Sequence, residues 1–556
     1  MSQSPPVEIA FLGGLGEIGR NMATIKVDGR LAIVDVGVLF PDAEHLGVDL
    51  ILPDWKWIKN RADDVEAVFL THGHLDHIGA LPYLLRDLDR SDVPVYGTRL
   101  TLAFVEAVLE EWPDIPKPDL QMIEPGDTVD QGPFSVEAVQ VSHSIPDGVA
   151  YAFRTPHGLI LHTGDFKLDQ SPLDGRPTDL AHFARLGDEG VDLLLADSTG
   201  ADTPGHVAPE RTIGATIRQH IADAEGLVVV ASFASHVHRI QQVLDAAVAV
   251  GRRPVFVGRS MIRNMAIAEE LGYLDFDGKT AVEPKDVDRY DRSELIVVST
   301  GSQGEPFSAL SLMGAGEHRT LDVGEGDLVI LASSLIPGNE QAVFRSINNL
   351  SRRGCTVIHK GVAHVHVSGH ASAEDLVLFH NIVEAENVVP VHGEHRHLRA
   401  HADIAKDTGA LPEKVFICED GDSLLLEDGR ITRGEGVPTS HVYIDGLLDD
   451  VGPALLRDRQ RIGEDGICIA IVTIDTHGRK VAGDTIVTQK GVVFTERAED
   501  ILEAARKAVD AELDRLTAAK FEDLAAVQRH VVQALGRFWK SETGRRPFIL
   551  PVVQDL

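Results

Sequence analysis

Short apolar runs separated by turn residues follow one another through the first third of the chain. Residues 7–12, 22–27 and 31–36 each predict a strand, and Asp28-Gly29 predicts a hairpin turn between the last two. A helix is predicted over 78–88. Further strands are predicted at 65–70, 93–96, 134–141, 149–154, 159–163 and 191–197. Strands joined by hairpins and interleaved with helices indicate a mixed sheet covered by helices.

From about His206 the pattern changes to a strict alternation of strand and helix. The strands of this region are predicted at 227–231, 254–257, 295–299, 328–333 and 356–359. Such alternation is typical of a doubly wound domain with a parallel sheet, in which ligands bind at the carboxyl ends of the strands. Small polar loops follow several of these strands, and some lead into helix N-termini, which favour phosphate.

After about Ser372 the chain is predicted to return to the first domain, through a strand at 388–391 and a helix near 395–405. Gly452 and Pro453, which follow two aspartates, mark a linker. The last stretch predicts a small α+β unit, with strands at 467–474, 484–487 and 548–553 and helices near 496–518 and 522–539. The expected division is a first domain in two parts (1–205 and 372–448), an inserted domain (206–371), a linker (449–463) and a C-terminal domain (464–556).

Composition limits the function classes. The chain of 556 residues is longer than one hydrophobic core usually serves. No apolar run approaches the roughly 20 residues that span a bilayer, and residues 1–6 lack the features of a signal peptide, so we expect a cytoplasmic protein without a membrane partner. The isolated cysteines Cys355, Cys418 and Cys468 predict neither a disulfide framework nor a thiolate metal site. A net charge of −34 opposes nucleic-acid binding unless bound metal ions and a locally basic cleft face the phosphates.

Glycines at Gly14, Gly16 and Gly19 form a GxGxxG pattern, which can bind a dinucleotide. That site requires a helix to begin at the third glycine, whereas a strand is predicted at 22–27. We therefore interpret these glycines as a loop that approaches an active site.

The strongest chemical signal is Thr71-His72-Gly73-His74-Leu75-Asp76-His77, between a predicted strand and helix. His72 and His74 can bind one metal ion, while Asp76 and His77 can bind a second. Two divalent cations about 4 Å apart can activate a shared hydroxide and stabilise charge on a phosphate. Imidazole and carboxylate ligands without thiolate suit Zn²⁺ or Mn²⁺. The alternative, a chance histidine cluster on a solvated turn, does not account for the spacing.

This HxHxDH pattern resembles the signature of the metallo-β-lactamase superfamily, whose fold is an αβ/βα sandwich. The resemblance implies that Asp35, at a strand end before the motif, orients the ligands through hydrogen bonds. It also implies further ligands at the ends of later strands. The implied ligands are His72, His74, His143 and Asp165 for one ion, and Asp76, His77, Asp165 and His392 for the other.

The doubly wound insertion resembles the β-CASP domain of nucleic-acid-processing members, whose remaining motifs match Asp197, His370 and His392. Over essentially its whole length the chain resembles the ribonuclease J family. The resemblance implies that a metal-activated hydroxide attacks the phosphodiester and that His370, positioned by Asp197, donates a proton or hydrogen bond. Asp197 could equally cap a helix, together with Ser198 and Thr199.

Members of that family act 5′-to-3′ on RNA, prefer a 5′-monophosphate and also cut internally, in RNA maturation and decay. A pocket one nucleotide beyond the metals would explain this preference. Its candidate residues are Ala234, Ser235, His236, His366, Val367, Ser368, Gly369 and His370. Phe233 either stacks on a base or packs in the core. The basic cluster at 395–399 favours a solvated helical face, and Asp49 with Asp445 is a candidate site for a structural cation.

The same resemblance implies single-stranded RNA as substrate, a homodimer or tetramer formed through the C-terminal domain, and other RNA-decay proteins as partners. Two rival functions stay open from the residues alone. One is a small-molecule hydrolase such as a thioesterase or lactonase, which would not need the large insertion. The other is a catalytically silent RNA-binding scaffold, which the complete ligand set opposes.

Overall fold

The computed structural model describes residues 4–42, 44–305, 307–334, 339–446, 451–493 and 498–556. The chain divides into two compact units, which are described separately. The larger unit comprises Met1–Asp42 with Leu50–Val442, and the smaller unit comprises Ala43–Asp49 with Tyr443–Leu556. None of the described helices is both long enough and apolar enough to span a membrane.

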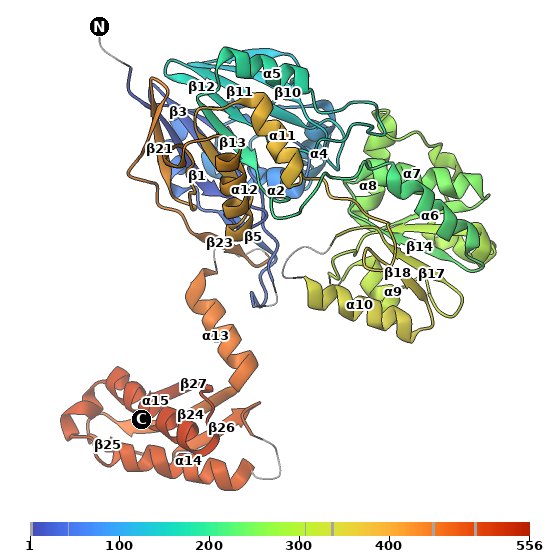
Figure 1. Cartoon of the computed structure of the whole chain (residues 1–556). Coiled ribbons are helices and arrows are strands. Elements are labelled where there is room, and N and C mark those ends of the chain that lie inside the picture. Colours follow the sequence, from blue (N-terminus) through green and yellow to red (C-terminus); the bar gives the residue numbers. More distant parts are fainter. Residues whose placement is uncertain (1–3, 43, 306, 335–338, 447–450, 494–497) are drawn as a thin grey trace. The chain divides into compact units, whose positions relative to one another are not determined.

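Two facing sheets form the centre of the larger unit within its described residues (Figure 1). The first sheet has the strand order β22 (Arg430–Arg433), β21 (Ser423–Glu427), β1 (Val7–Gly13), β3 (Met22–Val27), β4 (Arg30–Val34), β6 (Val65–Phe69), β7 (Pro94–Gly97), β8 (Asp119–Met122). The second sheet has the order β19 (Val388–Val391), β13 (Leu193–Asp197), β12 (Gly158–His162), β11 (Val149–Thr155), β10 (Phe134–Gln140), β9 (Thr128–Gln131). Residues after 372 therefore contribute strands to both sheets.

Apolar side chains from both sheets meet in one core. Phe11 and Phe69 of the first sheet pack in the same buried cluster as Tyr151 and Leu193 of the second. Helices α5 (Leu180–Glu189) and α11 (Ala373–Val383) bury Phe183 and Phe379 against the outer face of the second sheet. Helix α4 (Arg99–Leu109) contacts β7 and β8 of the first sheet. These layers confirm the predicted αβ/βα sandwich.

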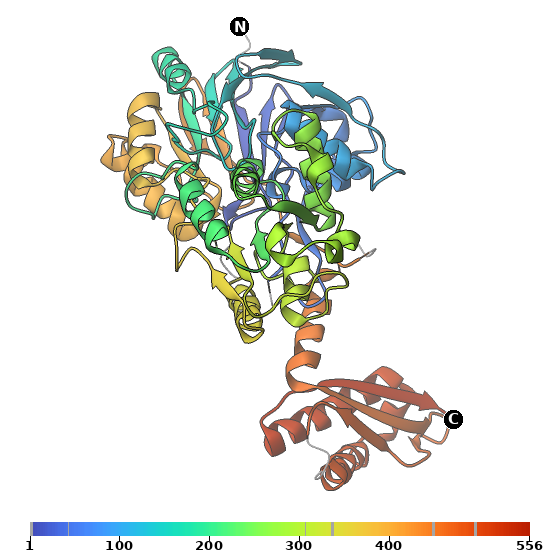
Figure 2. The same cartoon turned by 90° about the vertical axis from the view of Figure 1, so that its right-hand side faces the viewer.

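The insertion, coloured green to yellow in Figure 2, has a five-stranded parallel sheet among its described residues. Its strand order is β15 (Arg253–Val257), β16 (Leu295–Ser299), β14 (Val228–Ala231), β17 (Leu328–Leu331), β18 (Thr356–Ile358). The helices of this region are α6 (Thr212–Asp223), α7 (Val237–Ala249), α8 (Arg259–Glu270), α9 (Ala309–Ala315) and α10 (Glu340–Arg352). The central strand β14 precedes both of its neighbours in the chain, so the order confirms the predicted doubly wound topology.

The helix predicted over 78–88 is divided into α2 (Leu75–Ile78) and α3 (Leu81–Leu88). The break arises because the Ala80 N–H donates to the Val36 carbonyl at 2.9 Å and not to the preceding helical turn. The Val36 N–H donates in turn to the His77 carbonyl at 2.7 Å. Through these two bonds, Val36 after β4 holds α2, the short helix that contains Asp76 and His77 of the HxHxDH motif.

The smaller unit has the sheet order β25 (Lys480–Val481), β24 (Ile467–Asp475), β26 (Ile486–Lys490), and β27 (Phe548–Asp555) runs parallel to β24. Helices α14 (Ala498–Leu513) and α15 (Leu524–Thr543) cover one face of this sheet. The linker expected over 449–463 is helical from Gly452 onward, in α13 (Gly452–Asp465), while residues 449 and 450 lie outside the described residues. Pro453 in the first helical turn suits a helix start, because its missing N–H is not needed there.

Candidate metal centre and active site

The carboxyl ends of several strands converge at one edge of the sandwich. β4, β6 and β7 are parallel neighbours, as are β12, β13 and β19, so each set presents its ends together. The polar residues at these ends are Asp35 after β4, the HxHxDH motif after β6, Asp165 after β12, Asp197 at the end of β13 and His392 after β19. His143 follows β10 and joins them. The topology thus gathers residues that lie far apart in the sequence.

Tight backbone turns aim some of these side chains. Asp35 and His392 have φ angles of 60° and 52°, which non-glycine residues seldom adopt, and Gly164 beside Asp165 has 57°. Such conformations persist where the surrounding structure holds them, often at functional sites. A side chain on Gly164 would also meet Thr71 at 2.8 Å, so a glycine is required there.

The first group of residues that could hold a metal ion, called here the first ligand group, is His72, His74, His143 and Asp165. Nδ1 of His74 lies 3.0 Å from Nε2 of His72 and 3.2 Å from Nε2 of His143. Burial lowers the pKa of His74 to about 4 and holds the pKa of His72 and of His143 well below the usual histidine value. Neutral imidazole nitrogens that converge on one another cannot all donate hydrogen bonds. Their lone pairs fit a bound cation.

The second group that could hold a metal ion, called here the second ligand group, is Asp76, His77, Asp165 and His392. Nε2 of His77 lies 3.3 Å from Asp165 Oδ2 and 3.6 Å from Asp76 Oδ2. Nε2 of His392, also 3.6 Å from Asp76 Oδ2, is buried and accepts or donates no hydrogen bond among the described residues. Burial would raise the pKa of Asp165, but His392 and His77 lower it well below its usual value, so Asp165 is a carboxylate. This donor set also fits a divalent cation.

A layer behind the ligands fixes their orientation. Asp35 Oδ2 accepts from Nδ1 of His77 at 2.7 Å and from the hydroxyl of Thr71 at 2.8 Å, and Asp35 Oδ1 accepts from the Thr71 N–H. The amide nitrogen of Asn21 donates to the Asp76 carbonyl at 3.2 Å and lies 3.1 Å from Nε2 of His77. Thr71 and Asn21 were not predicted. The position of Thr71 directly before the motif was an available signal, whereas Asn21 gave none.

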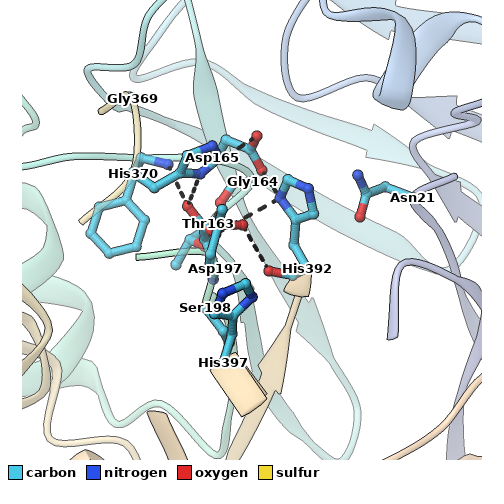
Figure 3. A network of polar contacts seen from close by, with 12 residues as sticks. Asn21, Thr163, Gly164, Asp165, Asp197, Ser198, Gly369, His370, His392 and His397 are labelled. Carbon is cyan, nitrogen blue, oxygen red and sulfur yellow. Dashed lines mark hydrogen bonds and ion pairs between the residues drawn. The ribbon is translucent and has the colours of Figure 1, made fainter. Parts of the chain in front are cut away.

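His370 and Asp197 form a close pair beside the ligands (Figure 3). Nδ1 of His370 lies 2.7 Å from Asp197 Oδ2. Burial would lower the pKa of His370, but the Asp197 charge and hydrogen bond raise it to about 9. Asp197, His370, Asp165 and His392 also lie close enough to one another to form a third group that could hold a metal ion. The residues after Asp197 form turns, and its Oδ1 accepts from the Thr199 N–H at 3.0 Å without capping a helix.

The segments proposed for the 5′-phosphate pocket adjoin the metal ligands. The ring of His236, which precedes α7, lies 5.8 Å from the ring of His74. The Gly369 carbonyl accepts from Nδ1 of His143 at 2.7 Å, and a Cβ at Gly369 would come within 2.6 Å of the His143 ring. Among the described residues, Nδ1 of His236 and Nε2 of His366 are buried without hydrogen-bond partners.

Other members of that proposed pocket make local contacts. The Ser368 hydroxyl accepts from the His370 N–H at 3.1 Å, and the Val367 carbonyl accepts from Nδ1 of His366 at 2.9 Å. Ala234 and Ser235 are half-buried, as is Phe233, whose ring packs edge-on against His236. The choice between base stacking and core packing for Phe233 therefore stays open.

Three remaining expectations concern residues away from this site. His395, Arg396 and Arg399 are exposed on α12 (His395–Asp407), and Arg396 pairs with Asp202 and Glu394, whereas His397 and Leu398 of the same cluster are buried. The cysteines are buried and unpaired.

The structural cation expected at Asp49 and Asp445 stays a prediction. Asp445 pairs with Arg459, and Asp49 accepts from the Gly446 N–H at 2.7 Å. The described groups that could hold a metal ion include neither aspartate. An arginine already neutralises Asp445, so the structure gives the expected structural cation no support.

Comparison with protein families agrees with this geometry. Residues 225–350 match the family described as "Ribonuclease J, beta-CASP domain", and residues 454–556 match "Ribonuclease J C-terminal domain". Residues 41–220 match "Beta-lactamase superfamily domain" and residues 356–418 match "Zn-dependent metallo-hydrolase RNA specificity domain". A crystal structure of a protein of unknown function from Enterococcus faecalis covers 76% of this chain and 100% of its own, with 16% identity and a TM-score of 0.53, which supports the fold alone.

Similarity to curated proteins extends over nearly the whole chain. "Ribonuclease J" of Mycolicibacterium smegmatis is 45% identical over 99% of this chain and 97% of its own length. "Ribonuclease J2" of Bacillus subtilis is 36% identical over 99% of both. Identity of 36–45% over nearly the whole chain agrees with the cluster of His and Asp side chains described above. The chain belongs to the ribonuclease J family of metal-dependent ribonucleases.

Proposed function

We propose that this chain is a dinuclear-metal 5′-to-3′ exoribonuclease that prefers a 5′-monophosphate, also cuts RNA internally, and acts in RNA maturation and decay. The observation that supports a dinuclear centre most directly is that Asp165 belongs to both ligand groups. One carboxylate can bridge two cations, as two-metal phosphodiester hydrolysis requires. Neutral imidazoles in the first group and additional carboxylate in the second suit Zn²⁺ or Mn²⁺.

Two such cations, when bound, would supply an activated water at neutral pH and offset charge on the phosphate. The residues of the chain perform the remaining tasks. Asp35 and Thr71 hold His77 in one orientation through the hydrogen bonds given above. Asp197 accepts from Nδ1 of His370 and raises the pKa of His370, which leaves Nε2 as the atom that donates a proton to the leaving oxygen.

Preference for a 5′-monophosphate is assigned to the two segments beside the first ligand group. Nδ1 of His236 is buried without a partner in the described residues and can donate to a phosphate oxygen. Nε2 of His366 is buried without a partner as well, but Nδ1 of His366 already donates to the Val367 carbonyl, so Nε2 donates only when the ring is protonated. The turn at Ser368 and Gly369 lies beside His143, whose Nδ1 donates to the Gly369 carbonyl, and the backbone N–H groups of this turn are further candidate donors. A phosphate held there would place the first phosphodiester at the metals.

The test uses one RNA with either a 5′-monophosphate or a 5′-triphosphate, incubated with Mn²⁺ or Zn²⁺. We expect release of mononucleotides, faster from the monophosphate and lost in His77→Ala. Cleavage without a 5′ preference would contradict the exonuclease assignment. A protein that binds metal but cleaves a thioester and not RNA would be a small-molecule hydrolase. One that binds RNA but never cleaves it would be a scaffold.

We also propose a homodimer formed through the smaller unit. The helices cover only one face of its sheet, and the other face is apolar and partly exposed. Ile486, Leu550 and Val552 are 55%, 41% and 38% exposed, and they register with the half-buried Ile469 and Ile471. An apolar sheet face of this kind favours a second copy of the same chain. Ile471→Glu should yield a monomer by light scattering, and a dimer that persists would contradict this surface.

A further inference from the structure

Four charged side chains are buried together between the sandwich and the insertion. Lys167 and Asp169 come from the loop after β12, Glu210 precedes α6, and Arg239 lies in the first turn of α7. Their side chains are between 0% and 5% exposed. We call these residues the buried tetrad. It has two positive and two negative groups, so its charges balance.

Arg239 makes the most contacts in the tetrad. Its Nε and Nη2 donate to the two carboxylate oxygens of Glu210 at 2.9 and 3.0 Å. Nη1 donates to the Ala332 carbonyl at 2.6 Å, and Nη2 also donates to the Val367 carbonyl at 3.3 Å. The planar guanidinium therefore joins α7, the end of β17 and the segment that contains the proposed phosphate pocket. A lysine could not make this set of bonds, because its ammonium is a single point donor.

The other half of the tetrad reaches the metal centre. Asp169 Oδ2 accepts from the Glu210 N–H at 2.8 Å, and Lys167 lies 3.5 Å from Asp169 and 3.7 Å from Glu210. The Lys167 N–H donates to the carbonyl of Ser142, the residue before His143. Lys167 and Asp169 stand two and four residues after Asp165. The tetrad thus connects the loop with the shared metal ligand to Val367.

We infer that Arg239 is a positioning residue that sets the span between the metal centre and the 5′-phosphate pocket, and thereby the length of the released product. This inference rests on the proposed function. Burying four charged side chains costs desolvation free energy, and apolar side chains would stabilise the fold equally well. The best-attested use of buried polar groups is to fix the register of one segment against another. The tetrad fixes the loop that contains Asp165 relative to the segment that contains Val367. In the proposed function, these two segments would bind the two ends of one nucleotide.

Arg239→Lys tests this without removing a buried charge. It keeps the ion pair with Glu210 and gives up the bonds to Val367 and Ala332. Arg252→Lys is the matched control: Arg252 is also a buried arginine of the insertion, and it donates to the Gly226 and Leu295 carbonyls at the opposite ends of the strands. The measurements are bound metal, internal cleavage of a 5′-blocked RNA, the rate ratio for 5′-monophosphate over 5′-hydroxyl RNA, and product length by mass spectrometry.

In Arg239→Lys we expect the rate ratio to fall at least about tenfold, because small misplacements near reacting groups have effects of that size. Dinucleotides should appear beside mononucleotides, while bound metal and internal cleavage stay as in wild type and in Arg252→Lys. Unchanged product length and rate ratio would overturn the inference. So would an equal loss of internal cleavage, which would make Arg239 a purely structural residue. A wild type with no 5′ preference would instead overturn the proposed exonuclease itself.

Discussion

The larger unit buries two polar clusters of similar size but opposite character. In the metal centre, imidazole nitrogens face one another at 3.0–3.2 Å, and Nε2 of His392 has no hydrogen-bond partner in the described part of the chain. In the tetrad, each cation lies beside a carboxylate and Arg239 uses several donors, although Nζ of Lys167, 3.5 Å from Asp169, makes no hydrogen bond within the described residues. Converging acceptors indicate a site that a cation completes, whereas the charges of the tetrad already balance one another. Burial alone does not distinguish the two clusters, but the arrangement of donors does.

The same substitution in both clusters should give the sharpest contrast. Asp165→Asn removes the charge shared by both ligand groups, and we expect it to lower bound metal and to slow RNA cleavage by about 1,000-fold or more, since metal stabilisation of the transition state amounts to several kcal/mol. Asp169→Asn, four residues further along, should retain its metal. Elemental analysis and cleavage rates check both variants. Equal loss of metal in the two would show that the clusters are not independent.

Removing one member of the tetrad should destabilise the protein strongly. Burial would raise the pKa of Glu210, but Arg239 and Lys167 lower it, so this carboxylate depends on its partners. Arg239→Gln leaves Glu210 short of a positive neighbour and should cost about 3–5 kcal/mol in the free energy of unfolding.

The double variant Glu210→Gln with Arg239→Gln removes both charges and should cost clearly less than the sum of the single changes. Urea unfolding of metal-loaded protein measures this cycle. Additive costs would mean that the two side chains do not stabilise each other, and the contrast with the metal centre would be lost.

That the candidate metal ligands come together could be predicted from sequence, because each follows an apolar run that forms a strand, and parallel strands present their carboxyl ends together. His72, Asp165 and His392 are examples. The tetrad could not, because Lys167 and Arg239 look like ordinary surface charges until the insertion packs on the sandwich. The break between α2 and α3 was missed for a related reason, since a long-range bond from Ala80 to Val36 overrides local helix propensity. Contacts between segments that lie far apart in the sequence cannot be predicted from the local pattern of apolar and polar residues.

A third buried group tests whether clustered imidazoles alone make a metal site. Nε2 of His380 and Nε2 of His401 lie 2.9 Å apart, and Nδ1 of His401 lies 2.9 Å from the Ser198 hydroxyl, with no carboxylate in the set. Burial lowers the pKa of His380 to about 4. The unfolded chain takes up a proton near pH 6.5 and the folded one only near pH 4, so stability falls as pH falls through this window, by at most about 3 kcal/mol.

His380→Gln should flatten this loss, because glutamine can still bond His401 but does not titrate. The exposed His395→Gln on α12 is the control and should lose stability with pH as wild type does. Urea midpoints at pH 7 and pH 5 give the comparison. Added Zn²⁺ could also stabilise the Asp165→Asn variant but not the double variant Asp165→Asn with His380→Gln. That result would show that the pair of His380 and His401 binds metal without a carboxylate.

The smallest expected effect separates a metal ligand from the group that aims it. Thr71 touches no site for a cation directly, yet its hydroxyl donates to Asp35 at 2.8 Å and lies 3.0 Å from Nδ1 of His72. Thr71→Val keeps the shape and loses these bonds, so metal affinity should fall by about 10–100-fold, the usual range for residues behind the ligands. Thr24→Val in β3 is the control, since the buried Thr24 hydroxyl has no partner among the described residues. Competition with a chelator measures the affinities. If Thr71→Val binds metal as tightly as Thr24→Val, packing alone holds the converging imidazoles, and the metal centre does not depend on hydrogen bonds from the residues behind it.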